Sequence, residues 1–254
     1  MRFTTVPAVL VAVSLATVLS GCKHAPTEKE LQLSVIHYDL GIQAQMAGNK
    51  QEAFTELEQS LSLDEKNLNA HNAMGVLLHL GFARHQEAIP RFLRAIELDP
   101  QFSEAKVNLG NVYLDLARYD EAVTLYDQAL NDMRYKTPYI AQGNLGWAHF
   151  KLGNPEKALD FIKSAVTLEP KFCLGYRNLA SIYESQQKLD DACTQLDNYR
   201  EHCPENADAY YRLGVCLAKQ GKQDEASARF AECEAKAPEG PLKDDCRRLG
   251  GNLQ

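Results

Sequence analysis

Residues 108–130, NLGNVYLDLARYDEAVTLYDQAL, decide the fold because their pattern returns along the chain. An Ala that follows Glu, Asp or Lys recurs every 34 to 36 residues, and a small residue stands 12 or 13 positions before it. Self-similarity at such a period is typical of arrays of stacked helical or stranded units. The alanines are Ala53, Ala88, Ala122, Ala158, Ala192 and Ala226, and the small residues are Gly41, Gly75, Gly110, Gly146, Ala180 and Gly214.

This pattern, seen again in YYRLGVCLAKQGKQDEASARFAECEAKAP at residues 210–238, resembles the tetratricopeptide repeat. The resemblance covers residues 34–240 and implies an all-α, right-handed α-solenoid of six tetratricopeptide repeats. We expect the repeats at about 34–67, 68–102, 103–138, 139–172, 173–206 and 207–240, and a short C-terminal covering helix and tail at 241–254. The covering helix protects the open end of the array.

Residue size and proline placement fit two helices in each repeat. The small residue and the Ala let antiparallel helices approach closely, and larger apolar residues are expected to fill the gap between repeats. Prolines end four of the second helices, because proline cannot continue the hydrogen-bond ladder. One extra residue in HLGFARHQEA (79–88) and two around NDMRYKTP (131–138) are expected to lie in loops. The large residues are Leu57, Tyr126, Ile162, Leu196 and Phe230, and the prolines are Pro100, Pro170, Pro204 and Pro238.

The N-terminal segment has the layout of an export signal. The apolar run 6–19 is shorter than the roughly 20 residues that a membrane-spanning helix needs, and a small positive start precedes it. The string Leu19-Ser20-Gly21-Cys22 resembles the lipobox of bacterial lipoproteins. That resemblance implies a signal peptide at 1–21, acylation of Cys22 and a lipidated tether at 22–33. An ordinary signal peptide with a chance cysteine is the alternative.

Lipidation would attach the protein to a membrane through its acyl chains, since two or three such chains anchor a protein stably. Lys23 replaces the Asp that retains lipoproteins in the inner membrane of Gram-negative bacteria. The expected location is therefore the outer membrane, with the protein facing the periplasm. After removal of 1–21 the chain has 26 basic and 34 acidic residues, which disfavours nucleic-acid binding.

The sequence offers no support for catalysis. It contains no nucleophile elbow, phosphate loop or haem motif, so we expect no enzyme activity, no cofactor and no small-molecule substrate. The seven histidines are dispersed, and we expect none of them to form a metal site with a carboxylate. They are His24, His37, His71, His79, His85, His149 and His202.

The first helix of each repeat is expected to line a concave face, at roughly its second, fifth, ninth and twelfth positions. Apolar residues at these positions in the first four repeats indicate a groove for a protein partner, because soluble proteins rarely expose large apolar patches. Each of them could instead belong to the core. In the last two repeats the same positions become polar and charged. The groove residues are Val35, Tyr38, Ile42, Val76, His79, Val107, Asn111, Leu114, Ile140, Trp147 and Phe150.

Six cysteines lie between residues 173 and 246, and an even number in an exported protein favours disulfides. Six thiols allow 15 pairings. The ends of antiparallel helices narrow the choice and predict Cys173–Cys203, Cys193–Cys216 and Cys233–Cys246. Buried free cysteines are the alternative, and a zinc site is disfavoured because no Cys-x-x-Cys pair exists.

Lipobox, short tether and six repeats together resemble the pilotin lipoproteins of type IV pili, which assist assembly of the outer-membrane secretin. The cysteine-rich last repeats look most like the social-motility lipoproteins of the Tgl type in gliding bacteria. The resemblance implies that the groove binds the secretin subunit and that the protein is needed for pilus-dependent motility. A lipoprotein adaptor for peptidoglycan hydrolases or for outer-membrane protein insertion is the alternative.

Overall fold

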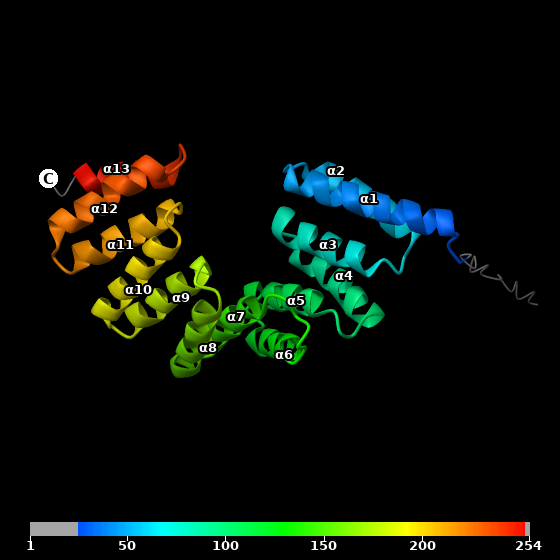
Figure 1. The fold of residues 1–254 in the computed structure, drawn as a ribbon, viewed down its shortest axis with the longest axis horizontal. Helices are drawn as coiled ribbons and strands as arrows, with labels where there is room; N and C mark the ends of the chain where they lie inside the picture. The colour runs from blue at the N-terminus through cyan, green and yellow to red at the C-terminus, as the bar shows by residue number, and fades with distance from the viewer. Residues whose placement is uncertain (1–24, 252–254) are drawn as a thin grey trace, which may run out of the picture.

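The computed structural model describes residues 25–251, and this part of the chain is all helical, with no strand. Thirteen α-helices form six antiparallel hairpins and one final helix, as the predicted α-solenoid requires (Figure 1). The helices are α1 Glu28–Met46, α2 Lys50–Leu63, α3 Leu68–Val76 continued by a π-turn η1 Leu77–Gly81, α4 His85–Leu98, α5 Ser103–Asp115, α6 Tyr119–Leu130, α7 Pro138–Lys151, α8 Pro155–Leu168, α9 Cys173–Ser185, α10 Leu189–His202, α11 Ala207–Lys219, α12 Gln223–Lys236 and α13 Pro241–Gly251.

The hairpins follow one another along an open arc (Figure 1). In this view α3, α5, α7 and α9 lie on the inner side of the arc, and α4, α6, α8 and α10 lie on the outer side. Each helix packs mainly against its neighbours in sequence. The inner surface is therefore built from the first helices of successive repeats, as the repeat pattern predicts.

Close packing inside each hairpin depends on the recurring small residue. Gly110 of α5 lies against the ring of Tyr126 in α6, and a Cβ added at Gly110 would come within 2.6 Å of that ring. Phe92 of α4 lies in the same way on Gly75 of α3. Both aromatic residues are fully buried. Tyr126 also belongs to the core cluster that contains Leu145 of the next repeat, as expected for the large residues, and it packs on the glycine of its own repeat as well.

The linkers at the helix ends are alike from one repeat to the next. Three-residue linkers join the two helices of each hairpin, and the middle residue of each has a positive φ. Each proline expected to end a second helix lies two residues after the last residue of α4, α8, α10 or α12. The middle residues are Gly48, Ala83, Ala117, Gly153, Gln187 and Gly221.

The two insertions are accommodated differently. The two extra residues near 131–138 lie in the longer connection between α6 and α7, where Tyr135 is buried. The extra residue of the second repeat is not in its loop, which has the same three residues and a left-handed Ala83 (φ 55°) like the others. It is absorbed within the first helix as the π-turn η1, where the Phe82 amide donates to the Leu77 carbonyl. The loop prediction was therefore wrong at this site.

The first helix begins earlier than the sequence indicates. Thr27 caps α1, accepting a hydrogen bond from the Glu30 amide, while the Glu30 carboxylate accepts one from the Thr27 amide (2.7 Å). This reciprocal capping box starts the helix at Glu28. Half of the stretch expected to be a tether at 22–33 is therefore helical.

The C-terminal helix α13 packs on α12, as expected for a covering helix. The expected signal peptide 1–21, with its lipobox, and the residues Cys22, Lys23 and His24 lie outside the described range 25–251. None of the helices in that range combines the length and hydropathy needed to cross a membrane.

Candidate partner-binding surface

Packing between neighbouring repeats decides which groove residues can meet a partner. Val107 is 3% exposed and packs with Ala122, Tyr126 and Leu145 in the core. His79 is 5% exposed. The assignment of Val107 and His79 to the groove is therefore wrong, because their side chains are used to join repeats.

The N-terminal part of the surface is more apolar than the sequence analysis recognised. Val35 is 53% exposed, and Leu31 and Met46 continue the same face of α1 with 41% and 84% exposure. Tyr38 and Ile42 lie half-buried between them. The i, i+4 and i, i+7 spacing of these residues is the signal that could have identified Leu31 and Met46. Further along, Val76 and Leu114 are half-buried against the core.

Trp147 and Phe150 form a pair on α7, with ring centroids 5.1 Å apart. Both are half-buried, and the Lys151 ammonium lies 5.0 Å from the Trp147 ring centroid. Both pack against a core cluster that contains Ile162 of α8 in the same repeat and Leu179 of α9 in the next. A rigid aromatic pair that is partly exposed and backed by core is typical of a binding hot spot.

A hollow of about 600 Å³ lies between α5, α7 and the start of α9. The side chain of Asn111 is fixed there, because the Tyr126 hydroxyl (2.8 Å) and the Asn144 amide (2.7 Å) both donate to its Oδ1. Among the described residues no acceptor pairs with the Nδ2 of Asn111, so this group can donate to a bound chain. The hollow is lined by Asn111, Tyr139, Ile140, Asn144, Glu169, Lys171, Phe172 and Leu174.

The surface becomes charged in the last two repeats. A smaller hollow of about 200 Å³ is lined there by Arg177, Arg212 and Lys219, among others. Arg212 pairs with Asp208 (2.7 Å) and Lys219 pairs with Glu184 (3.1 Å). This part of the surface thus carries charged side chains, as the sequence pattern predicts for the last two repeats.

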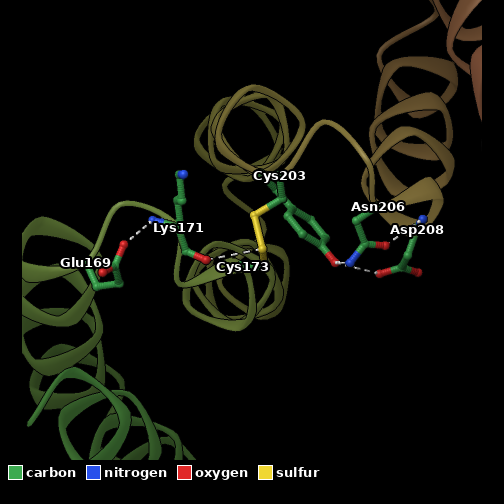
Figure 2. Close-up of a disulfide and its surroundings, with 7 residues drawn as sticks. Glu169, Lys171, Cys173, Cys203, Asn206 and Asp208 are labelled. Atoms are coloured by element: carbon green, nitrogen blue, oxygen red, sulfur yellow. Dashed lines mark hydrogen bonds between the residues drawn. A yellow bond between two sulfur atoms is a disulfide. The ribbon is translucent and has the colours of Figure 1, made fainter. Parts of the chain in front are cut away.

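Another hollow, of about 750 Å³, lies at the edge of the last repeats over the Cys173–Cys203 disulfide. Figure 2 shows this bridge between α9 and the end of α10, with the Lys171 carbonyl oxygen 3.3 Å from the sulfur of Cys173. Lys171 also contributes to the hollow of the inner surface. The sequence analysis missed this edge as a surface. It is lined by Lys171, Cys173, His202, Cys203, Pro204, Glu205, Asn206, Ala207, Asp208, Lys236, Pro238 and Leu242.

A hydrogen-bond network holds the side of this hollow that Asn206 and Asp208 form at the start of α11. Asn206 donates from Nδ2 to the Tyr199 hydroxyl (2.8 Å) and accepts from the Asp208 amide at Oδ1 (3.1 Å), and it caps α11 in this way (Figure 2). Burial, assisted by the Asp208 carboxylate, raises the pKa of Tyr199. The Tyr199 hydroxyl therefore stays neutral and keeps its role in the network.

The structure pairs all six C-terminal cysteines, as Cys173–Cys203, Cys193–Cys216 and Cys233–Cys246. These bridges join α9 to the end of α10, α10 to α11, and α12 to α13. Each therefore links helices that the antiparallel arrangement places side by side. These are the pairs that the repeat geometry predicts.

One histidine cluster contradicts the sequence analysis. His79, His85 and Asp115 lie together between the second and third repeats, each with a ligand atom within 4.8 Å of the others. The expectation that no histidine reaches a carboxylate at metal-binding distance was wrong, because the π-turn and the stacking of repeats bring these residues together.

The fold and this surface define a class of helical repeat protein, and comparison with known families gives the same result. Two models described as tetratricopeptide repeat match residues 102–169 and 177–241, which together make up about half of the chain. The chain is a tetratricopeptide-repeat protein. Such repeats typically mediate binding between proteins.

Among individual proteins, the type IV pilus assembly protein PilF of Pseudomonas aeruginosa is 23% identical over 236 residues, which cover 89% of this chain and 91% of that protein. The crystal structure of PilW, a type IV pilus biogenesis factor, matches with a TM-score of 0.74 and 24% identity over 84% of this chain and 98% of that one. The structure of Pseudomonas aeruginosa PilF matches with a TM-score of 0.69 and 17% identity, over 87% and 99%.

Other relatives share only part of their length with this chain. Hsp70-Hsp90 organizing protein 3 of Arabidopsis thaliana is 25% identical over 194 residues, which are 73% of this chain and 33% of that protein. The chain spans less than a fifth of human protein O-mannosyl-transferase TMTC3. The similarity to these larger proteins reflects the shared repeat.

Proposed function

We propose that this protein is an outer-membrane lipoprotein that acts as a pilotin for a type IV pilus. It binds the secretin subunit in the periplasm and promotes its assembly into the outer-membrane multimer. The observation that carries the proposal is the alignment with PilF, which covers about nine-tenths of both chains. The matches to longer repeat proteins cover only a fraction of the length of those proteins.

The inner surface supplies the binding site in this proposal. The apolar stripe of α1 and the pair Trp147 and Phe150 bury apolar segments of the subunit, while Asn111 donates a hydrogen bond to its backbone. Aromatic residues at the centre of such a surface contribute most of the affinity. The charged surface of the last two repeats then selects the register of the bound segment.

The early start of α1 sets the distance to the membrane. Acylation at Cys22 leaves the short segment 23–27 before the helix begins at Glu28. At about 3.3 Å for each extended residue, this segment spans roughly 17 Å. The array is therefore held close to the lipid headgroups, where tethering raises the effective concentration of bound subunits.

The proposal is tested by measuring heat-resistant secretin multimers in a strain that lacks the gene for this protein. We expect the multimers and pilus-dependent motility to be lost, and to return with the wild-type gene. Complementation with Cys22→Ala is expected to give a folded but detached protein and few multimers. Normal multimers in the deletion strain would refute the pilotin role.

Capture of partners by the lipidated protein separates this role from that of a cell-envelope adaptor. Retention of the secretin, lost in a Trp147→Ala variant and kept in a variant of exposed Leu93 on α4, supports the pilotin role. Retention of peptidoglycan hydrolases or outer-membrane insertion factors in its place would support the adaptor role.

A further inference from the structure

The contact between the second and third repeats contains a cluster of polar side chains that partner binding does not use. His79 lies in the π-turn η1, His85 is the first residue of α4, and Asp115 is the last residue of α5. His79 is 5% exposed, His85 is half-buried, and the Asp115 side chain is 54% exposed. The cluster is therefore anchored in the interior and open to solvent on one side.

The two imidazole rings face each other through the same kind of atom. Nδ1 of His79 lies 2.8 Å from Nδ1 of His85, and the ring centroids are 4.9 Å apart. The other nitrogen of His79, Nε2, lies 3.4 Å from a carboxylate oxygen of Asp115. A proton on Nε2, facing this carboxylate, leaves the Nδ1 lone pair of His79 directed at His85.

This arrangement matches the donor set of a transition-metal site. Imidazole nitrogen and carboxylate oxygen are ligands of Zn²⁺ and of neighbouring divalent metals, and Zn²⁺ binds nitrogen at about 2.0–2.1 Å. Two nitrogens bound to one tetrahedral ion at that distance are about 3.3 Å apart. To bind one ion, the Nδ1 atoms therefore need to separate by about 0.5 Å, and the rings need to turn so that both lone pairs point at the ion.

The carboxylate of Asp115 occupies the place of an outer-shell partner. Metal-binding histidines commonly donate their second N–H to a carboxylate, which fixes the tautomer and makes the ligand more basic. Asp115 lies in that position relative to His79 and adds a negative charge beside the cation. The solvent-exposed side of the cluster leaves room for water ligands.

Among the described hairpins, only the second repeat has a π-turn in its first helix. The other hairpins have α-helical first helices, whereas the π-turn inserts one residue just where His79 lies. One residue corresponds to a rotation of about 100° around a helix. The π-turn thus turns the end of this helix relative to its start, and π-turns are frequent at functional sites.

We propose that His79 and His85 bind a divalent transition-metal ion such as Zn²⁺ through their Nδ1 atoms, with Asp115 as the outer-shell carboxylate. The ion joins η1 and α4 of the second repeat, and Asp115 links it to α5 of the third. It fixes the angle between the second and third repeats, and so the curvature of the N-terminal half of the inner surface.

Equilibrium dialysis of the full chain in detergent micelles against Zn²⁺ tests this site. We expect the wild type to bind one ion, His85→Ala to weaken binding at least tenfold, and Asp115→Asn to weaken it by about 10- to 100-fold. The control is His202→Ala, which removes an exposed histidine at the other end of the array and should leave the affinity unchanged. Circular dichroism verifies that each variant is folded.

Imidazole ¹⁵N NMR observes the metal ligands directly, and the Asp115→Asn variant assigns their signals. Zn²⁺ should shift the Nδ1 signals of two of the seven histidines, and the two should be those that Asp115→Asn also perturbs. Failure of the wild type to bind Zn²⁺, equal affinity in His85→Ala, or shifts confined to other histidines would overturn the proposal. The His79–His85 pair would then be a neutral hydrogen bond that packs the two repeats together.

Discussion

Replacing Cys193 and Cys216 together with Ala should loosen the C-terminal end of the array while leaving its N-terminal end unchanged. This disulfide links α10 to α11, and so joins the fifth repeat to the sixth. Both cysteines are buried, with Cα atoms 5.6 Å apart. Alanine fits these positions without strain, so loss of the covalent link dominates the effect.

The magnitude follows from the length of chain that the bridge closes. The two cysteines are 23 residues apart, and a loop of that size lowers the entropy of the unfolded chain by an amount worth about 3.4 kcal/mol. Because each repeat of such an array contacts only its neighbours, the loss of stability should be local. It corresponds to an increase of about 300-fold in the equilibrium constant for opening of α10–α12.

Hydrogen–deuterium exchange measured by mass spectrometry resolves this effect along the chain. Amides of α10–α12 should exchange faster in the Cys193→Ala/Cys216→Ala variant, and α1–α8 serve as the internal control. A matched variant without Cys233 and Cys246 should move the effect to α12 and α13. Unchanged exchange in α10–α12, or a uniform increase over the whole array, would refute the reasoning.

Three further predictions address the surface, the packing and the response to pH. Trp147→Ala should weaken partner binding at least tenfold in a pull-down titration, whereas Leu93→Ala on the exposed side of α4 should not. Gly110→Ala should lower stability by about 1–3 kcal/mol in thermal melts, because the added Cβ meets the Tyr126 ring at 2.6 Å. Burial lowers the pKa of His71 below 6.5, so the unfolded chain binds a proton that the folded chain does not. Stability should therefore fall as the pH drops through 6.5, and less so in His71→Gln.

Much of the fold could be predicted because the same residue pattern occurs six times, which makes each weak local signal reliable. A single Gly or Pro gives weak evidence about structure, but Gly110 and Pro170 are each one instance of a position that recurs in phase. An insertion occurs in a single repeat, so its location cannot be inferred from a recurring pattern. The sequence shows one extra residue near Ala83, but the left-handed conformation of that residue fixes the loop, and the helix has to absorb the insertion.

Exposure of the groove residues was harder to predict, because it depends on the next repeat as well as on position in the helix. Tyr38 and Val107 hold equivalent positions in their repeats, yet Tyr38 is half-buried and Val107 is in the core. Val107 belongs to the core cluster that contains Leu145 of the following repeat, whereas Tyr38 is only partly buried against the core of the first repeats. Packing against the following repeat, as well as position in the helix, therefore decides which residues are left for a partner.

The same stacking explains why the histidine cluster was missed. Ligand pairs on a single helix are separated by three or four residues, but an array also places residues one period apart side by side. Asn72 and Asn108 are 36 residues apart and form a 3.0 Å hydrogen bond, and His79 and Asp115 have the same separation. A search for ligand sets in a repeat protein therefore has to compare residues one period apart. In this chain that search combines His79 with Asp115 and, through the short linker after the π-turn, with His85.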